Sequence, residues 1–205
     1  MYIPAHFNEA DQAEIRRILD AAPLATLVAQ TAEGLIANHL PLLSAPDGRL
    51  IGHVALNNDM HRLITPEQEV MAIFRPHDGY VSANFYPSKA EHHMAVPTWN
   101  YQAVHIYGRI TFQYEEQQKR AAVGLLTRLH ERRVNGDKAW RMADAPADYM
   151  TGMLGNIVAF ELVPSRVLAK SKLSQNRSAE DYAGAAAGLE ATGYGPTAAA
   201  MRARG

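Results

Sequence analysis

The sequence predicts a mainly β protein, an antiparallel barrel that carries peripheral helices. Strand-like segments dominate the first two-thirds of the 205-residue chain, and the turns between them have hairpin length. The longest segment, residues 98–113, opens with polar and aromatic residues and then alternates like a β-strand. One face of this segment carries Val104, Ile106, Gly108, Ile110 and Phe112, and the other carries His105, Tyr107, Arg109 and Thr111. A barrel with one long strand follows from these observations.

The first elements of the chain are predicted to be a helix, three strands and a short helix. A helix is predicted from an Asn8 cap to about Ala22, with Ile15, Ile18 and Leu19 as its apolar stripe and Pro23 as its stop. Strands follow at 24–30, 35–43 and 50–56, with turns at 32–34 and 46–48. Asn58 or Asp59 then caps a short helix that ends before Pro66.

The middle of the chain adds two short strands, a loop and the clearest helix. The strands are predicted at 70–74 and 79–82, and residues 83–96 are predicted to form a mobile loop. After the long strand, a helix over 115–134 repeats Ala122, Leu125, Leu126 and Leu129 at helical spacing and ends at Asn135-Gly136.

The C-terminal third predicts one or two helical turns at 147–154, a strand at 157–163 that Pro164 ends, and a last strand at 167–173. Ser178 with Asp181 is typical of the start of a helix. We therefore expect a single domain over residues 1–182. Residues 183–205, rich in Ala and Gly, form a tail expected to be helical or loosely ordered.

Composition narrows the classes of function. The net charge of −1 argues against a surface built throughout for nucleic acid, and the absence of cysteine excludes disulfides and thiolate chemistry. We see no signal peptide and no apolar run that could span a bilayer, so we expect a cytoplasmic protein without membrane contact. Metal spacing such as HExxH and phosphate loops such as GxGxxG are missing, and no metal site is predicted.

The segment Val96-Pro97-Thr98-Trp99-Asn100-Tyr101, with Val104-His105 and Gly108, resembles the most recognisable motif of the PaiB family. Further fragments agree in order along the chain: Met1–Pro4 with His6-Phe7, Asn38–Leu42, Gly52–Ala55 with Asn57, Tyr80–Ser82, Tyr86–Lys89 and Lys172–Asn176. The resemblance covers residues 1–182. The PaiB family is described as FMN-binding negative transcriptional regulators.

The resemblance implies a fold and a cofactor. The fold is the FMN-binding split β-barrel, which is pyridoxamine-phosphate-oxidase-like, antiparallel and of Greek-key type. The cofactor is FMN, held in a homodimer with its ring system near the subunit interface and its phosphate gripped by a hairpin. Residues 36–42 and 53–62 would form that hairpin. The implied cofactor-binding residues are Asn38, His39, His53, Asn57, His61 and Arg62, with Trp99, Asn100, Tyr101 and His105 from the partner subunit, and Lys172 and Ser174.

Three points stay open at this stage. Residues 75–83 depart from the family pattern, so Arg75 either replaces a lost contact or is a surface charge. Residues 172–176 either grip a phosphate or lock the tail onto the barrel. The alternative to a regulator is an enzyme on the same scaffold, either a flavin-dependent oxidoreductase or a haem-binding or haem-degrading protein. Direct DNA binding is not favoured, because the basic residues of 115–134 are balanced by Glu115, Glu116 and Glu131.

Overall fold

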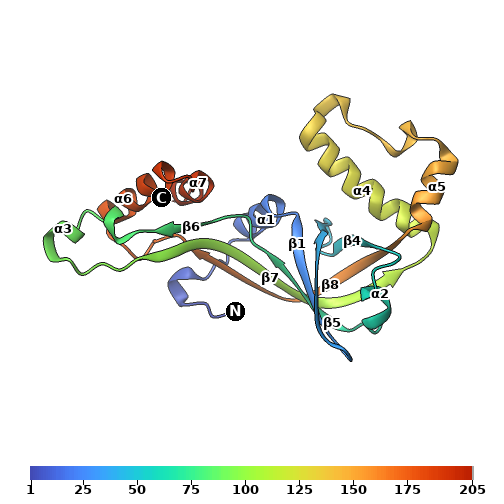
Figure 1. Ribbon diagram of the computed structural model, residues 1–205, viewed down its shortest axis with the longest axis horizontal. Helices are drawn as coiled ribbons and strands as arrows, with labels where there is room; N and C mark the ends of the chain where they lie inside the picture. The colour runs from blue at the N-terminus through green and yellow to red at the C-terminus, as the bar shows by residue number, and fades with distance from the viewer. Residues whose placement is uncertain (205) are drawn as a thin grey trace. The chain divides into compact units, whose positions relative to one another are not determined.

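A computed structural model describes residues 1–204, and its contacts divide the chain into two compact units. The first unit contains Met1–Ala22, Arg75–Val104 and the chain from Leu168 onward. The second contains Pro23–Phe74 and His105–Val167. Two strands of 16 residues each, β7 (Thr98–Gln113) and β8 (Ile157–Lys172), continue from one unit into the other (Figure 1).

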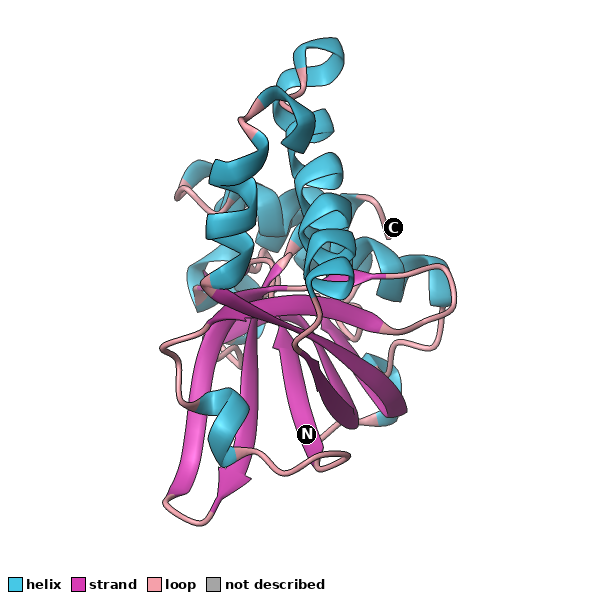
Figure 2. Cartoon of the chain, turned by 90° about the vertical axis from the view of Figure 1, so that its right-hand side faces the viewer, coloured by secondary structure: helices cyan, strands magenta, loops and turns pink. Residues whose placement is uncertain are grey.

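The strands form one eight-stranded sheet in the order β2-β1-β5-β7-β8-β4-β3, with β6 paired to β7. Its strands, magenta in Figure 2, pair antiparallel in every ladder whose register we describe. The sheet is not closed into a full barrel. The remaining strands are β1 (Leu24–Thr31), β2 (Gly34–Pro41), β3 (Leu43–Ser44), β4 (Leu50–Ala55), β5 (Glu69–Phe74) and β6 (Asp78–Val81). The predicted antiparallel split-barrel fold is confirmed.

The core of the second unit lies on the inner face of these strands. Ala25, Leu27 and Ala29 of β1 alternate inward and are all but fully buried. On β4, Gly52 allows a close approach, because a Cβ atom there would lie 2.5 Å from the ring of Phe160 and 2.7 Å from Leu42. The alternation predicted from sequence therefore defines an inner, packed face and an outer face in this unit.

Three helices belong to the second unit: α2 (Met60–Leu63), α4 (Glu116–Asn135) and α5 (Ala147–Gly155). Short 3-10 turns lie between α4 and α5 at Gly136–Lys138 and Met142–Asp144. Ala122 packs with Ile51 of β4, and Leu126 is buried. The prediction that Leu125 and Leu129 belong to the apolar stripe of α4 is wrong, because 38% and 44% of these residues are exposed. Only the side of α4 that carries Ala122 and Leu126 is buried.

In the first unit, α1 (Gln12–Ala21) begins later than predicted. Asp11 is the N-cap, and its carboxylate accepts the backbone N–H of Ala13 at 3.0 Å. The Asn8 cap is wrong, since Asn8 instead forms a β-bridge with Lys170. Ile15, Ile18 and Leu19 are buried as predicted. A 3-10 turn at Ala5–Phe7 precedes this helix.

Residues 83–96 are not a plain loop, which corrects the sequence prediction. They contain a 3-10 turn at Ala83–Phe85 and the short helix α3 (Lys89–His92). The carboxylate of Asp181 accepts both the backbone N–H and the hydroxyl of Ser88, at 3.1 and 2.8 Å. A contact between residues 93 positions apart fixes the start of this helix.

Strand β8 runs through Pro164, which therefore does not end a strand as predicted. Its ladder with β4 extends from Ile157 to Leu162 only. Because β4 has ended before Pro164, the missing N–H of the proline costs no hydrogen bond to that neighbour. The two strands predicted at 157–163 and 167–173 are thus one.

The Ala- and Gly-rich C-terminal segment forms α6 (Ala179–Ala191) and α7 (Gly195–Arg202). Ala185, Leu189 and Met201 are fully buried in one apolar cluster with Val81. Most of the segment predicted as the tail is therefore helical in the structure. Ser178 caps α6 as predicted, because its hydroxyl accepts the N–H of Asp181 at 3.2 Å.

Candidate functional site

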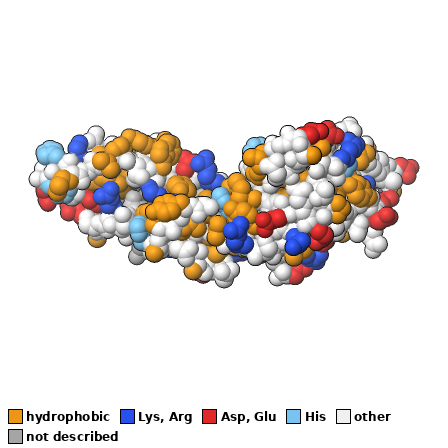
Figure 3. Space-filling model, turned by 90° about the horizontal axis from the view of Figure 1, so that it is seen from below, with side chains coloured by type: hydrophobic (Ala, Val, Ile, Leu, Met, Phe, Trp, Pro, Cys, Tyr) orange, Lys and Arg blue, Asp and Glu red, His pale blue; other side chains and the backbone are white. Residues whose placement is uncertain are grey.

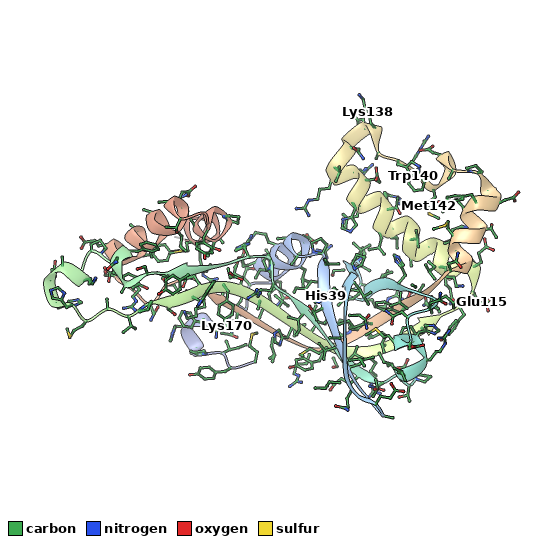
Figure 4. All side chains as sticks on the ribbon, viewed as in Figure 1. His39, Glu115, Lys138, Trp140, Met142 and Lys170 are labelled. Carbon is green, nitrogen blue, oxygen red and sulfur yellow. The ribbon has the colours of Figure 1, made fainter. Side chains whose placement is uncertain are left out.

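The outer face of β1, β2 and β5 carries the first group of predicted site residues. In the register of these strands, Thr26 lies between His39 of β2 and Ile73 of β5. The Thr26 hydroxyl and His39 Nδ1 are 3.0 Å apart, and the His39 side chain is exposed. Figure 4 labels His39 on its strand. Alternation fixes this outward direction, as the sequence predicted, and places the polar pair beside the apolar side chains of Val28 and Ile73.

His105 lies on the outward-facing side of β7, the strand next to β5 in the sheet. It is half-buried, and its Nδ1 atom is buried without a hydrogen-bond partner in the described chain. Burial lowers the pKa of this imidazole. A neutral ring with an unused nitrogen can donate to or accept from a bound polar group.

Asn38 points to the inner face with Leu27, its register partner. Its side-chain oxygen accepts the amide of Asn58 at 2.8 Å, and Asn58 in turn accepts the N–H of Met60 at 3.0 Å. Asn57, which was predicted as a contact, is exposed in the same turn. Asn58 is therefore the residue that connects β2 with the start of α2. Sequence reasoning considered it only as a helix cap.

The predicted hairpin of residues 36–42 and 53–62 is wrong as a pairing. Strand β2 is hydrogen-bonded along its length to β1, whereas β4 pairs with β3 and β8. The Asn38–Asn58 hydrogen bond nevertheless brings the two segments together. The two segments are thus joined by a side-chain hydrogen bond rather than by the backbone hydrogen bonds of a hairpin.

His61 and Arg62 of α2 already have protein partners. The two ring nitrogens of the buried His61 lie 2.9 Å from the carbonyl of Leu56 and 3.3 Å from the hydroxyl of Tyr114. Arg62 pairs with Asp59 at 2.7 Å and donates to the same carbonyl of Leu56 at 3.2 Å. These side chains stabilise the turn, and only Arg62 is exposed enough to reach a ligand.

His53 lies on a different surface of the second unit from His39. Its register partner on β8 is Ala159, which packs with Ala122 of α4. His53 Nδ1 is buried without a partner in the described chain, and burial lowers the pKa of the ring. The side chain is a neutral, unsatisfied group on the face of β4 that α4 covers.

In the first unit, the structure joins the two most characteristic motifs of the sequence. Asn100 is fully buried, and its amide donates to the Ser174 hydroxyl at 2.9 Å. That hydroxyl donates back to the side-chain oxygen of Asn100 at 3.2 Å. Ser174 has a positive φ of 64°, a rare conformation for a serine. This pair favours the locking role for residues 172–176.

Lys172 has a different environment. Its amine donates to the hydroxyl of Thr98 at 2.6 Å and to the carbonyl of Trp99. Burial, followed by repulsion from Lys170 and Arg177, lowers its pKa. Neither hydrogen-bond acceptor carries a negative charge, so no carboxylate occupies the place of an anionic partner.

Aromatic rings surround the second lysine of this strand. Lys170 is 6% exposed, and its amine lies 5.2 Å from the centre of the Tyr101 ring and 3.2 Å from the carbonyl of Tyr2. Trp99 is 49% exposed and meets Tyr80 and Tyr194 edge to face. Sequence reasoning missed Lys170. Its period-two spacing from Lys172 in a strand was the available signal.

The altered segment 75–83 contains a local ion pair. Arg75 and Asp78 are 2.9 Å apart, and the arginine side chain is 60% exposed. Of the two interpretations of Arg75, this geometry favours the surface charge. Among residues 1–204, no group of three or more histidine, aspartate or glutamate side chains is placed to hold a metal ion. No helix in the same range is long and apolar enough to cross a membrane.

The strand order and the open antiparallel sheet define a protein of the split-barrel fold. The chain belongs to the family described as "Putative FMN-binding domain", which matches residues 1–166. The resemblance to the PaiB family is thereby confirmed, and the family assignment supports FMN as the cofactor. Lys172 and Ser174 lie outside the matched range.

Individual relatives agree with this assignment. The chain is 29% identical over 185 residues to protease synthase and sporulation protein PAI 2 of Bacillus subtilis, covering 89% of this chain and 86% of the relative. The flavocytochrome Anf3 from Azotobacter vinelandii has a similar structure, with a TM-score of 0.61, 16% identity and coverage of 89% and 78% of the two chains. An FAD and heme binding protein from Mycobacterium smegmatis has a TM-score of 0.60 and 16% sequence identity. The match covers 86% of this chain and 78% of that protein. At this identity the two structures show the fold alone.

Proposed function

We propose that the protein is a homodimeric FMN-binding split-barrel protein that acts as a negative transcriptional regulator of the PaiB type. The observation that carries the proposal is the family match over residues 1–166 on a sheet whose outer face presents His39, Thr26 and the unpartnered Nδ1 of His105. The regulatory role is proposed from the family resemblance alone. The assignment of FMN is supported by both the family match and the geometry of the outer face.

The residues present fit FMN. Its isoalloxazine ring needs a flat, mostly apolar surface with a few polar groups at its edge. The outer face of β1, β2 and β5 offers Val28, Met71 and Ile73 beside the Thr26–His39 pair. A buried nitrogen without a partner, such as His105 Nδ1, costs free energy until a ligand satisfies it. Bound FMN would supply redox chemistry, while these side chains bind and orient it.

The phosphate of FMN needs cations, and the candidates come from different parts of the chain. Arg62 is exposed beside Asn57 at the end of β4. Lys172 carries a positive charge that no carboxylate neutralises, and Trp99 and Tyr101 lie on the neighbouring strand. We place His39, Asn57 and Arg62 on one subunit, and Trp99, Tyr101 and Lys172 on its partner. Asn38 points to the inner face, so it would act indirectly, through its hydrogen bond with Asn58. Asn100 and Ser174 would then act indirectly, by holding β7 against the segment after β8.

The same outer face supports the homodimer. Leu24 and Leu35 are 65% and 74% exposed, and both point outward with Val28 in the register of β1 and β2. Figure 3 shows hydrophobic side chains, orange, gathered in patches on the face of the molecule that it draws. Exposed apolar side chains on one sheet face are typical of an interaction site, and a second copy of the chain would cover them.

The test is an absorption spectrum of purified protein after FMN is added and free flavin is removed. We expect retained flavin at micromolar protein. The His39→Ala variant should retain less of it, whereas His92→Ala, on the exposed helix α3, should behave like the parent. Light scattering on the same samples should give the mass of a dimer.

Two results would change the proposal. If the protein retained no FMN at micromolar concentration, the assignment of FMN as its cofactor would be wrong. A haem spectrum after hemin is added, without flavin retention, would favour the haem-binding alternative on the same scaffold. The regulatory role is tested separately, by comparing transcripts in cells with and without the gene. Unchanged transcript levels would leave a flavoprotein without that role.

A further inference from the structure

A second concave site lies in the second unit, between α4 and the segment that follows it. The pocket has a volume of about 700 Å³ and is lined by residues of α4 and of the chain from Gly136 to Asp144. Pockets that hold small molecules have volumes of about 300–1,000 Å³. None of its lining residues was predicted as a flavin contact.

The walls of this pocket are held in place by hydrogen bonds. One carboxylate oxygen of Glu131 accepts the backbone N–H of Trp140 at 2.9 Å and the side-chain amide of Asn135 at 2.7 Å. These donors lower the pKa of Glu131, so the carboxylate stays ionised. Gly124 of α4 lies beside Met142 of the facing segment, whose sulfur would be 3.5 Å from a Cβ atom at that glycine. Figure 4 labels Trp140 and Met142 on the segment that runs back from the end of α4.

Positive charge exceeds negative charge in the lining. Arg128 and Arg132 are four residues apart on one face of α4, and neither side chain forms a hydrogen bond or an ion pair within residues 1–204. Lys138 and Arg141 add two cations from the opposite wall, and Arg141 pairs with Asp144 at 3.2 Å. Asp137 is the second carboxylate. Four cations against two carboxylates leave an excess of two positive charges, in a chain whose net charge is −1.

An aromatic ring accompanies these cations. Trp140 lines the pocket and is 42% exposed, although its backbone is fixed by Glu131. An indole held on a rigid wall is a surface on which a planar ring can stack. The partial negative charge at the C-terminal end of α4, equivalent to about half an elementary charge, opposes an anion there. The two positive charges of the Arg128 and Arg132 guanidinium groups are larger than this partial negative charge.

We propose that this pocket binds a small phosphate-bearing molecule with a planar ring, of the nucleotide class. Guanidinium groups recognise phosphate through paired N–H donors, and Arg128 and Arg132 have these donors available. Trp140 would stack on the ring, while Arg141, Lys138 and the excess positive charge would attract the phosphates. The concave shape favours a small molecule over a DNA duplex, which needs a cationic surface that it can reach from outside.

Isothermal titration calorimetry tests the proposal on the full chain as purified, with ADP, adenosine and pyrophosphate as probes. We expect ADP to bind more tightly than either pyrophosphate or adenosine, because it alone engages both the cations and the indole. The Arg128→Gln/Arg132→Gln variant should weaken ADP binding by about tenfold or more. Arg120→Gln is the matched control, since Arg120 is exposed on α4, pairs with Glu116 and does not line the pocket.

Trp140 provides an independent readout. It is one of two tryptophans in the chain, so a Trp99→Phe background isolates its fluorescence. ADP should change this emission in the background variant and fail to do so when Arg128 and Arg132 are replaced. The absorption of any retained FMN should stay unchanged in the arginine variant, because the flavin is assigned to other residues.

Several outcomes would overturn the inference. ADP binding that the double variant leaves unchanged, or adenosine binding as tightly as ADP, would remove the phosphate-binding role. Loss of FMN from the double variant would make this pocket the flavin site instead. Binding of a DNA duplex that depends on Arg128 and Arg132, with no binding of ADP, would identify a nucleic-acid surface and end the small-molecule assignment.

Discussion

The hydrogen-bonded pair of Asn100 and Ser174 makes a sharp prediction about stability. Asn100 is 0% exposed and Ser174 4% exposed, and their side chains exchange hydrogen bonds of 2.9 and 3.2 Å. Asn100→Ala removes both bonds, each contributing about 1 kcal/mol net, and leaves the buried Ser174 hydroxyl without its partner at a further cost of about 1 kcal/mol or more. We expect the free energy of unfolding to fall by about 3 kcal/mol.

The assay is urea unfolding followed by circular dichroism, at one fixed protein concentration because a dimer would unfold in a concentration-dependent way. Ser174→Ala and the double variant complete a double-mutant cycle. The coupling energy should be about 1–2 kcal/mol. Asn135→Ala is the surface control, since this exposed side chain bonds only to Glu131 and should cost less than about 1 kcal/mol.

A coupling energy near zero would refute the reasoning, because it would mean that the two side chains contribute independently of each other. The flavin readout adds a second distinction. If residues 172–176 lock the chain rather than grip a phosphate, Ser174→Ala should lower stability while FMN affinity, measured well below the unfolding transition, stays close to that of the parent.

Three further predictions follow from packing, charge and exposure. Gly52→Ala should destabilise by about 1–3 kcal/mol through overpacking against Phe160, whereas Gly152→Ala, with open space around it on α5, should be neutral or stabilising in the same urea assay. Burial lowers the pKa of His53 and His105 below about 6.5, so the unfolded chain binds more protons than the folded one just below that pH. The free energy of unfolding should therefore fall as pH drops below about 6.5, and His53→Gln should flatten that dependence; an unchanged slope would contradict the assignment. Ala37→Glu, on the exposed outer face of β2, should convert a dimer to a monomer in light scattering, while Ala147→Glu at the start of α5 should leave the mass unchanged, and a dimeric Ala37→Glu variant would place the interface elsewhere.

The sequence predicted well those features whose causes are local. The alternation of residues 98–113 predicted β7 and both of its faces, because successive side chains of a strand point to opposite sides. The Ser178 cap and the end of α4 at Gly136 were predicted because each depends on residues within one or two helical turns. His39 was placed on its outer face for the same reason.

Tertiary structure decided the features whose partners lie far away in the chain. Asn100 and Ser174 are 74 residues apart, and nothing in either motif specifies that they meet. Asn38 and Asn58 come together although β2, which carries Asn38, and β4, which precedes Asn58, do not pair with each other. In α4, Ala122 and Leu126 are buried whereas Leu125 and Leu129 are exposed, because only one side of the helix is covered. The charges of Arg128 and Arg132 are visible in the sequence. The pocket that they line depends on how the segment after α4 folds back, where Glu131 accepts the backbone N–H of Trp140.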